Sequence, residues 1–469
     1  MAGGDAYGMA DRIRVSCVQL DGHDVSEADR ALDEAEAAAR RAAENADVVV
    51  LPEATYPGYV LHDSRDFLEP KWWSRGLETF GEVARTSGAS IVVGLIRSVN
   101  GRVRNSAAVL GPTGDLAGVT DKSFLWHFDS LWFEPGAPSG VLQLPFGETG
   151  VFVCADARMT EIPRCLAVEG ARLLVDTTAL VLNAGGNAQI DYMLAARAWE
   201  NGSFLAVANK CGYEAGLAHY AGQSAIYDPG GEVIVRAGRD EPAIVTAEID
   251  LARATGPRGR RRPTSYGSLT RPSSPSSNGP VDPASTRPLR IGMAQADADE
   301  LRSRRELAVD LVITRRDVAA EGVLAATPDG FRFGGTRYVG GDVLQVASEK
   351  FGLLSGDQLA VPEEARCLML EGASVLVWDR PPTDRTPIEV LRTRADENRV
   401  FLIVSSSTHG WMVIGPTGAI QAEGGGDDRL HAVLVELHPA LTRSKEMAPG
   451  TDVLAHRQPE RYAALTRSE

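Results

Sequence analysis

Two parts of the chain repeat the same short segments in the same order, and this repeat limits the fold more than any other feature of the 469 residues. Internal similarity of this kind indicates two copies of one structural unit. The matched segments are RVSCVQ (14–19) with RIGMAQ (290–295), RCLAVEGARLLV (164–175) with RCLMLEGASVLV (366–377), RAWENGSFLAVA (197–208) with RADENRVFLIVS (394–405), and the spaced residues Pro263, Tyr266, Leu269 and Arg271 with Pro459, Tyr462, Leu465 and Arg467.

The second copy is the shorter one. Arg14 and Arg290 are 276 positions apart, whereas Arg164 and Arg366 are only 202 positions apart. The second copy therefore lacks about 74 residues between its first and second motifs.

A linker separates the two copies. Residues 272–287, PSSPSSNGPVDPASTR, hold four prolines and five serines, a composition that cannot supply a packed element. We therefore predict a first domain at 1–271, a disordered linker at 272–287 and a truncated second domain at 288–469.

Strands and helices alternate along the first copy. Apolar runs with the length of buried strands are separated by segments with helical periodicity. This alternation favours an α/β layered fold, in which helices cover a sheet. The expected strands are 12–19, 48–51, 91–96, 151–153, 173–175 and 204–208, and the expected helices are 26–45, a segment from about 160, and 191–201.

Charge and hydropathy argue against two kinds of partner. The 48 basic and 63 acidic side chains give a net charge of −15, so a phosphate backbone is a poor ligand. The sequence has no run of about 18 apolar residues, the length that a membrane-spanning helix requires. We therefore expect neither nucleic acid nor membrane as a partner.

The cysteines and the metal-binding patterns bear on the compartment and on cofactors. Five cysteines in so long a chain argue against a disulfide framework, and MAGGDAYGMADR has no signal-peptide pattern. We therefore expect a cytoplasmic location. The sequence contains no CxxC pair and no HExxH motif, so it predicts no zinc site, and we expect neither a metal nor another cofactor.

Three residues that follow apolar strands are candidates for chemistry. Glu53 ends VVVLPE, Lys122 precedes a run of aromatic residues, and Cys154 stands at a strand-to-helix turn. A carboxylate partly withdrawn from water suits a general base. A thiol at a helix start meets backbone N–H groups that favour the thiolate, so we expect Cys154 to be alkylated before the other thiols.

Each of these residues, taken singly, has an ordinary alternative. Glu53 would be an acid that ends a strand and faces water. Lys122 would be a surface lysine beside an apolar cluster, and Cys154 would be a small core residue. The combination of the three is far more specific than any one of them.

Together these residues and their neighbours resemble the nitrilase (carbon–nitrogen hydrolase) superfamily. The motifs are LPE at 51–53, DK at 121–122 and VCADAR at 153–158. The resemblance covers residues 12–271. Supporting segments are RNSAAVLGPTGDLAG (104–118), RAWENGSFLAVAN (197–209), GQSAIYDPGGEVI (222–234) and RRPTSY (261–266).

The resemblance implies a four-layer αββα sandwich, here in tandem with a truncated second copy, and a catalytic triad of Glu53, Lys122 and Cys154. Cys154 would attack the substrate carbon and form a thioester, while Glu53 would move the protons. Lys122 and the backbone N–H of Ala155 would stabilise the oxyanion. Asp129 corresponds to the supporting acid of the family, and it is one methylene shorter than the glutamate expected there.

One departure from the family pattern bears on the substrate. Nitrilases proper carry Trp-Glu after the cysteine, whereas this chain has Ala155 and Asp156. An aspartate at the second place is similar to amidases and carbamoylases. The small Ala155 implies additional room beside the nucleophile.

Three further residues are candidates for substrate binding. Arg158 lies where similar amidases hold an arginine, and it would bind a substrate carboxylate. The equally weighted alternative is a salt bridge from Arg158 to Glu161 or Glu200. Trp126 and His127 would line the pocket, although a histidine among aromatic residues is more often simply packed.

The second copy is expected to be catalytically dead. The position of Cys154 falls on Ser355 or Gly356, and neither is a thiol. The absent stretch would have carried the counterparts of Glu53 and Lys122. We expect this copy to act as a built-in partner in an intramolecular pseudo-dimer, with a homo-oligomer as the alternative assembly.

The predicted function is hydrolysis of a non-peptide C–N bond in a small amide, as in an amidase or carbamoylase, with release of ammonia. A nitrilase that converts a nitrile to an acid and ammonia is the close alternative. An acyltransferase would use the same thioester, but no amine acceptor site is recognisable. A non-catalytic pseudoenzyme, used for binding or assembly, is the alternative of a different class.

Overall fold

The computed structural model divides into two compact units. Unit 1 comprises Met1–Arg258 and Ala448–Thr451, and unit 2 comprises Gly259–Met447 and Asp452–Glu469. Most of the predicted linker at 272–287 lies outside the described residues, so the domain boundaries stay a prediction. The structure describes residues 11–182, 186–273, 287–293, 309–315, 321–327, 329–408, 410–424 and 433–468.

The first sheet of unit 1 contains the N-terminal strands. Its order is β10-β1-β2-β3-β4-β5, and β15 pairs antiparallel with β1. Strands β1, β2 and β3 run parallel, so their carboxyl ends meet at one edge of the sheet. The strands are β1 (Arg12–Asp21), β2 (Val48–Val50), β3 (Ser90–Val99), β4 (Arg102–Leu110), β5 (Leu116–Asp121), β10 (Lys210–Cys211) and β15 (Ala243–Asp250).

The second sheet of unit 1 has the order β14-β13-β9-β8-β7-β6. Its central strands β7, β8 and β9 are also parallel. The strands are β6 (Leu142–Leu144), β7 (Gly147–Val153), β8 (Leu173–Thr177), β9 (Phe204–Ala208), β13 (Ala225–Tyr227) and β14 (Val233–Arg236), with a separate ribbon of β11 (Tyr213–Glu214) and β12 (Ala218–His219).

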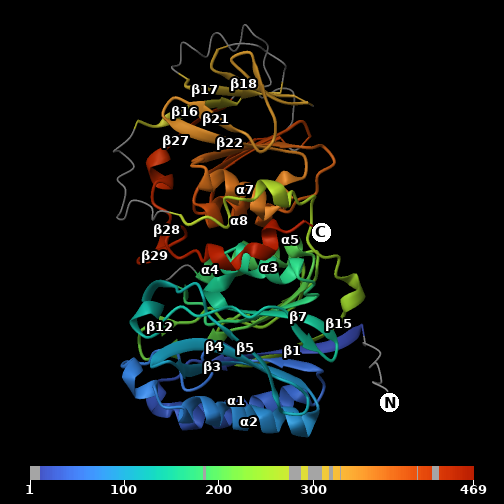
Figure 1. Ribbon diagram of the computed structural model, residues 1–469, viewed down its shortest axis with the longest axis vertical. Coiled ribbons are helices and arrows are strands. Elements are labelled where there is room, and N and C mark those ends of the chain that lie inside the picture. Colours follow the sequence, from blue (N-terminus) through green and yellow to red (C-terminus); the bar gives the residue numbers. More distant parts are fainter. Residues whose placement is uncertain are drawn as a thin grey trace. The chain divides into compact units, whose positions relative to one another are not determined.

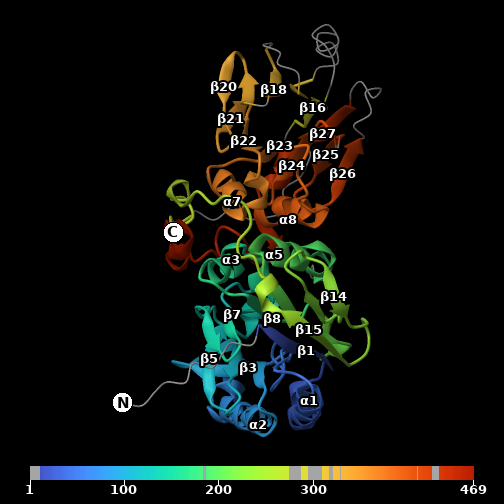
Figure 2. The same cartoon turned by 90° about the vertical axis from the view of Figure 1, so that its right-hand side faces the viewer.

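Helices cover both sheets of unit 1, as the layered prediction requires. In both ribbon views α1 and α2 lie on one side of the sheets, and α3 and α5 lie on the other side (Figures 1 and 2). The layers therefore run helix, sheet, sheet, helix. The helices are α1 (Ala28–Ala43), α2 (Lys71–Ser87), α3 (Glu161–Val168), α4 (Gly186–Ala188) and α5 (Leu194–Asn201), and the 3-10 helices are η1 (Val25–Glu27), η2 (Ser64–Phe67), η3 (His127–Leu131), η4 (Cys154–Arg158) and η7 (Leu251–Arg253).

The sequence of α1 explains how this layer holds together. Leu32, Ala35 and Ala39 lie on one helical face and belong to a buried cluster with Val49 of β2 and Ile91 of β3. Small alanines let the helix approach the sheet closely, and each apolar group withdrawn from water favours the packed state.

Two of the predicted helices begin differently from the sequence expectation. Asp24 accepts the backbone N–H of Ser26 and starts η1 ahead of α1, whereas a start at Ser26 was predicted. The predicted helix at 191–201 begins as a π-helix, Gln189–Met193, before α5. A π-helical turn leaves the backbone locally wider than an α-helix, and such turns are frequent at functional sites.

Unit 2 has two sheets of its own, and their strands follow the order found in unit 1. The first sheet is β20-β19-β18-β17-β16-β27 and the second is β21-β22-β23-β24-β25-β26. Strand β16 lies between β27 and β17, as β1 lies between β15 and β2. The strands are β16 (Leu289–Met293), β17 (Leu311–Thr314), β18 (Val323–Thr327), β19 (Gly330–Phe333), β20 (Thr336–Tyr338), β21 (Val343–Val346), β22 (Glu349–Ser355), β23 (Val375–Arg380), β24 (Phe401–Ser406), β25 (Gly410–Ile414), β26 (Ile420–Gly424) and β27 (Val433–Leu437).

The remaining elements of the second half are short. A buried cluster of residues from both sheets forms the core of unit 2. The helices are α7 (Pro362–Leu370) and α8 (Ile388–Asn398), the 3-10 helices are η8 (Pro263–Ser265), η10 (Gln358–Ala360), η11 (Pro439–Thr442), η12 (Pro459–Arg461) and η13 (Ala463–Thr466), and the last strands are β28 (Glu446–Ala448) and β29 (Thr451–Asp452).

Candidate active site

Glu53 lies just past the end of β2, where the backbone passes very close to β3. A Cβ atom on Gly94 would lie 2.3 Å from the carbonyl oxygen of Pro52 and 2.5 Å from the Cα of Glu53, so only glycine permits this approach. The N–H of Gly94 bonds the Pro52 carbonyl, and Thr55 N–H bonds the Gly94 carbonyl. These contacts fix the backbone that carries Glu53.

Lys122 follows β5, and both its backbone N–H and its backbone carbonyl are hydrogen-bonded. Its N–H bonds the carbonyl of Asn105 on β4, and its carbonyl accepts the N–H of Gly136. The Nζ atom lies 2.8 Å from Oε1 of Glu53 and 2.7 Å from Oδ2 of Asp129. The structure therefore brings Glu53, Lys122 and Asp129 together, and the shorter side chain of Asp129 reaches the lysine directly.

The two carboxylate oxygens of Glu53 differ: one accepts hydrogen bonds and the other has no partner. Its Oε1 also accepts a hydrogen bond from Nδ2 of Asn105 at 2.7 Å. Within the described part of the chain, Oε2 is buried and has no hydrogen-bond partner. The open oxygen is available to take a proton, which a general base requires.

Cys154 follows β7 and has a left-handed backbone, with φ of 53°. Its N–H donates to Oδ1 of Asp176 at 2.7 Å, and its carbonyl accepts Nε2 of Gln189 at 3.1 Å. Such a conformation costs about 1–3 kcal/mol and persists where the surroundings enforce it. Strained residues of this kind cluster at functional sites.

Asp156 connects the nucleophile turn to the loop after Lys122. Its Oδ2 accepts the N–H of Val153, and its Oδ1 accepts the N–H groups of Ser123 and Phe124. Burial raises the pKa of Asp156 to about 6. The aspartate after Ala155 therefore holds two loops together. Ala155 itself is buried directly beside Cys154.

The surroundings of Lys122 keep it charged. Burial disfavours the charge, but the carboxylates of Asp129 and Glu53 outweigh burial and raise the pKa of Lys122 well above its ordinary value. A permanently charged ammonium in a water-poor site suits stabilisation of an oxyanion.

The expectation of a resting thiolate is contradicted. Burial, followed by the negative charge of Glu53, raises the pKa of Cys154 well above its ordinary value, although Lys122 acts in the opposite direction. The local helix start and the nearby lysine do not offset the loss of solvent. Cys154 is therefore a neutral thiol at rest, and it needs a base to become a nucleophile.

An aromatic shell surrounds the ion pair, as the run of aromatic residues after Lys122 suggested. The Tyr59 ring contacts Phe128, Trp132 and Phe133 at centroid distances of 5.9, 6.0 and 5.9 Å. Lys122 Nζ lies 5.8 Å from the Tyr59 centroid. The Tyr59 hydroxyl donates to Asp129, so this ring both excludes water and holds the supporting acid.

Sequence reasoning missed a second buried ion pair behind this shell. Oε1 of Glu214 accepts the N–H groups of Tyr59 and Val60 at 2.6 and 2.8 Å. Its Oε2 accepts Nζ of Lys210 and the hydroxyl of Tyr220, both at 2.8 Å. Glu214 thus fixes the loop that carries Tyr59, and no local motif signals a contact across 155 positions.

Arg158 and Trp126 face one another. The guanidinium carbon of Arg158 lies 4.2 Å from the Trp126 ring centroid, a cation–π contact. Arg158 is buried and its Nε donates to Oε1 of Gln189 at 2.9 Å. Since Gln189 also bonds the Cys154 carbonyl, the guanidinium and the nucleophile turn share one partner.

His127 also lies beside this group, at the start of η3. Its backbone is left-handed, with φ of 49°, and its ring contacts Phe128 edge to face. Among the described residues its buried Nδ1 atom has no hydrogen-bond partner.

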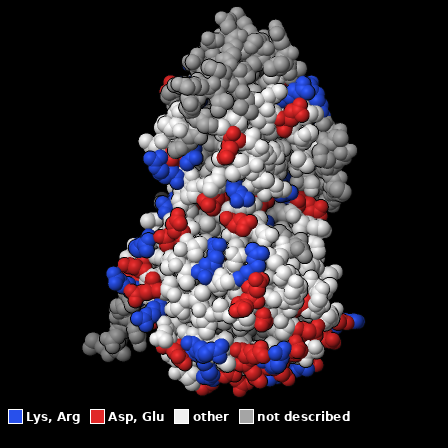
Figure 3. All heavy atoms as spheres, turned by 180° about the vertical axis from the view of Figure 1, so that it is seen from behind, with Lys and Arg blue, Asp and Glu red and all other residues white. Residues whose placement is uncertain are grey.

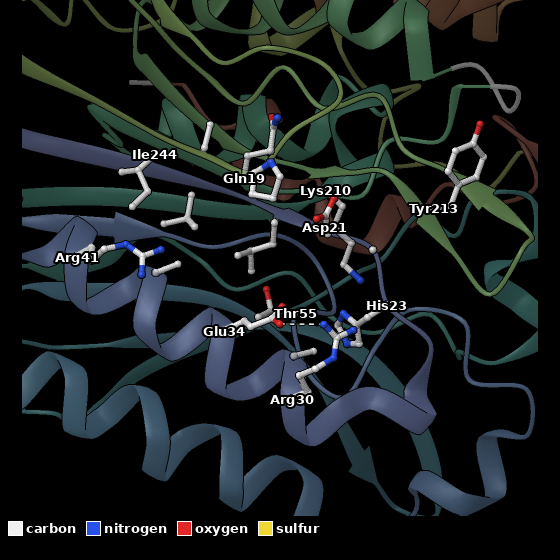
Figure 4. A pocket seen from close by; sticks show the side chains of 17 residues that line it. Gln19, Asp21, His23, Arg30, Glu34, Arg41, Thr55, Lys210, Tyr213 and Ile244 are labelled. Carbon is white, nitrogen blue, oxygen red and sulfur yellow. Dashed lines mark hydrogen bonds and ion pairs between the residues drawn. The ribbon is translucent and has the colours of Figure 1, made fainter.

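A separate cavity of about 600 Å³ lies in unit 1 between α1 and the carboxyl end of β1. In Figure 4 the side chains of His23, Arg30 and Lys210 gather at one end, and Arg41 and Ile244 lie at the other. Glu53, Lys122 and Cys154 are not among the residues that line it. This cavity is therefore distinct from the catalytic group.

The surface of unit 1 mixes charges of both signs. Exposed ion pairs join Arg30 to Glu34 and Arg40 to Glu36. Figure 3 shows the same mixing on one face, with basic and acidic side chains lying among one another. Such a surface offers little to a phosphate backbone.

The described residues carry neither a metal-binding cluster nor a membrane-spanning helix. They hold no group of three or more His, Cys, Asp or Glu side chains placed to hold a metal ion. None of their helices has both the length and the apolar character needed to cross a bilayer.

Comparison with known proteins places this constellation in a family. The Carbon-nitrogen hydrolase family matches residues 14–258. The chain belongs to the carbon–nitrogen hydrolase family. It is accordingly a nitrilase-superfamily enzyme that hydrolyses C–N bonds.

Individual members of the family show the same similarity. A nitrilase from Pyrococcus abyssi is 32% identical over 244 residues, which cover 51% of this chain and 90% of that protein. An omega-amidase from Xenopus tropicalis is 30% identical over 220 residues, which cover 45% of this chain and 79% of that protein. A solved amidase from Nesterenkonia sp. is 26% identical with a TM-score of 0.47, and the match covers 53% of this chain and 94% of that one.

The match to the carbon–nitrogen hydrolase family ends at residue 258. The three predicted motifs lie inside it, and unit 2 lies beyond it. A non-catalytic role for the whole chain is therefore not retained.

Proposed function

We propose that this carbon–nitrogen hydrolase is an amidase that cleaves a small amide through a cysteine thioester and releases ammonia. The observation that carries the proposal is the buried contact of Lys122 with Glu53 and Asp129, electrostatically coupled to Cys154. A neutral thiol that feels the charge of a carboxylate with one unpartnered oxygen suits base-assisted thiol attack.

In the first half-reaction the Cys154 sulfur attacks the amide carbon, and the thiol proton passes to Glu53. The carbonyl oxygen becomes an oxyanion, which the Lys122 ammonium and the Ala155 N–H stabilise. The tetrahedral adduct collapses, the C–N bond breaks, and the nitrogen leaves as ammonia with the proton returned by Glu53. The acyl group stays on Cys154 as a thioester.

In the second half-reaction water replaces the leaving amine. Glu53 takes a proton from the water, whose oxygen attacks the thioester carbon. The C–S bond breaks, the proton passes to the sulfur, and the carboxylic acid leaves. The neutral thiol and the Glu53 carboxylate are restored, so the cycle needs no cofactor.

Asp129 and Tyr59 act through Lys122. The Asp129 carboxylate stabilises the lysine charge, and the Tyr59 hydroxyl fixes the carboxylate. Arg158 stacked on Trp126, with His127 beside them, is the proposed subsite for the rest of the substrate. A guanidinium there favours an amide that also bears a carboxylate.

An ammonia-release screen across amides, ureides and nitriles tests the proposal, with the Cys154→Ala protein as the blank. Amides, above all those that also bear a carboxylate, should give Cys154-dependent ammonia. Ammonia that is equal in the blank would contradict the mechanism.

A nitrilase is the second candidate, because the Pyrococcus abyssi relative carries that name. The same screen separates the two candidates. Turnover of nitriles with no turnover of the matching amides would replace the amidase proposal.

We also propose that residues 288–469 are a degenerate, catalytically dead copy of the first domain at 1–271, joined to it by the linker at 272–287. The repeated sequence motifs support this, as does the common strand order of the two pairs of sheets. The family match itself covers only residues 14–258, so the second copy rests on the repeat.

A further inference from the structure

A segment from far along the chain is part of unit 1. Ala448–Thr451 belong to this unit with Met1–Arg258. The hydroxyl oxygen of Thr451 accepts the backbone N–H of His127 at 2.7 Å, across 324 positions. Thr451 is fully buried and the hydrogen bond is partly buried, so competition from water is reduced.

The recipient of this bond is a strained turn. His127 has φ of 49°, a left-handed conformation that costs a residue with a side chain about 1–2 kcal/mol. A strained residue persists only when its surroundings hold it. The Thr451 hydroxyl satisfies the N–H that this conformation presents, and so it stabilises the turn.

The turn carries groups of the proposed active site on both sides. The N–H of Trp126 donates to Oδ2 of Asp129 at 2.7 Å, and this oxygen also contacts Lys122. The Trp126 ring lies over Arg158. A shift of the His127 backbone would therefore move the supporting acid and the proposed substrate subsite together.

We propose that Thr451 is a positioning residue for the hydrolase, and that the C-terminal part of the chain is required for full activity because it supplies this residue. The proposal rests on the proposed function of the Cys154 site. It gives Ala448–Thr451 an indirect, positioning role in the reaction, and these residues lie outside the family match, which ends at residue 258.

The test compares Thr451 with a matched threonine in the full-length chain. Thr442 is also buried, and its hydroxyl bonds the carbonyl of Pro439 within its own turn. The variants are T451V, T451A, T451S and the control T442V. For each we would measure kcat and KM for the best amide, the melting temperature, and hydrogen exchange of the peptide around residues 124–131.

The expected result is a fall in kcat/KM of about tenfold for T451V and T451A, in line with the cost of a small misplacement. KM should rise several-fold, because the turn also positions the proposed substrate subsite. Partial unfolding alone would lower only the apparent kcat and leave KM unchanged, so KM separates the two explanations. Exchange at 124–131 should accelerate. T451S should restore both values, and T442V should resemble the wild type.

Three results would overturn the proposal. One is a T451V protein with wild-type KM and wild-type exchange at 124–131. Another is an equal loss in T442V. The third is unfolding of both T451V and T451A while T442V folds, since Thr451 would then be a structural residue only. A wild-type protein that releases no ammonia from any amide or nitrile contradicts the proposed function instead, and the exchange measurement still decides the role of Thr451.

Discussion

The two units build the same turn after corresponding strands, and only one of the two turns carries a nucleophile. Strand β7 ends at Val153 and leads to Cys154 with φ of 53°, and strand β22 ends at Ser355 and leads to Gly356 with φ of 60°. The same backbone turn thus forms with a nucleophile in unit 1 and without one in unit 2. Of the two positions predicted for the counterpart of Cys154, the backbone favours Gly356.

The hydrogen bonds of the two turns correspond as well. Asp156 accepts the N–H of Val153, and the side-chain oxygen of Gln358 accepts the N–H of Ser355 at 2.8 Å. An amide therefore replaces the carboxylate without loss of the turn.

The space beside the turn differs between the units. Asp176 of β8 accepts the Cys154 N–H, whereas the buried Trp378 of β23 donates its ring N–H to the Gly356 carbonyl at 3.1 Å. The strand registers place Trp378 at the position that Asp176 holds in unit 1. The two turns therefore share a backbone conformation and differ in the residues that surround it.

Buried lysines show the same contrast. Carboxylates surround Lys122 in unit 1 and raise its pKa, despite burial. In unit 2, burial and the charges of Arg399 and Arg366 lower the pKa of Lys445 to about 7. Its Nζ donates to the carbonyls of Asn398 and Arg399. A buried lysine keeps its charge where acids are placed around it, as at Lys122 and not at Lys445.

The largest expected effect is that of removing the thiol. Cys154→Ala should lower ammonia release by at least about 1,000-fold, because the covalent step is lost. The control is Cys367→Ala, which removes a buried thiol of α7 in unit 2 and should keep activity. Circular dichroism would verify the fold of both variants, and comparable losses would break the contrast between the units.

The reverse change tests whether a thiol alone makes a site. The double variant Cys154→Ala, Gly356→Cys should be as inactive as Cys154→Ala, because the buried Trp378 packs against the turn at Gly356 and no counterpart of Lys122 is expected. Recovery of ammonia release by the double variant, measured on the same amide, would show that unit 2 retains a usable site.

A smaller but substantial effect should follow from Gly94→Ala. The added Cβ would overlap the backbone that holds Glu53, so kcat should fall by roughly 10- to 100-fold, with a destabilisation of about 1–3 kcal/mol. Gly238→Ala is the matched control, since a Cβ there meets nothing within 4 Å. Steady-state kinetics and urea unfolding would measure both, and wild-type kinetics for Gly94→Ala would refute the close approach.

The strand register sharpens this prediction. When Cys17 is matched to Met293 in the repeat, the parallel ladders place Gly94 opposite the position of Ala326. Unit 2 therefore has a Cβ at the position where unit 1 excludes one.

The smallest effect concerns pH and stability. Above about pH 7 native Lys445 is neutral, whereas an unfolded lysine stays charged to about pH 10. The unfolded state then binds the extra proton, so the free energy of unfolding should rise with pH between these values, by at most about 1.4 kcal/mol per pH unit.

Urea unfolding of Lys445→Met from pH 7.5 to 9.5 would check this, because the substitution should remove that part of the slope. Lys350→Met, at an exposed lysine of unit 2, is the control and should leave the slope unchanged. An identical slope in all three proteins would contradict the lowered pKa.

Much of the fold of unit 1 was predictable, because its central strands are continuous apolar runs such as Val48–Val50. The short edge strands were not predicted, since segments such as Lys210–Cys211 carry no periodic signal. The π-helical start before α5 was also missed, because it depends on packing around Gln189 rather than on local preference.

The candidate site divides in the same way. Glu53, Lys122, Asp129 and Cys154 belong to local motifs and were predicted to act together, and the structure brings Lys122 against both acids. Glu214 and Tyr59 were missed, because their contacts join distant segments. The protonation of Cys154 was predicted with the wrong sign, since burial is a property of the folded unit and outweighs the local helix start.

The central claim is that chemistry occurs on Cys154 of the first turn and nowhere in unit 2. Rapid quenching of the full chain with its best amide, followed by peptide mass spectrometry, tests this most directly. The account predicts an acyl mass on the peptide that contains Cys154 and unmodified Cys367. An acyl group on a unit 2 peptide, or full turnover with Cys154 unmodified at every time point and in the Cys154→Ala protein, would contradict it.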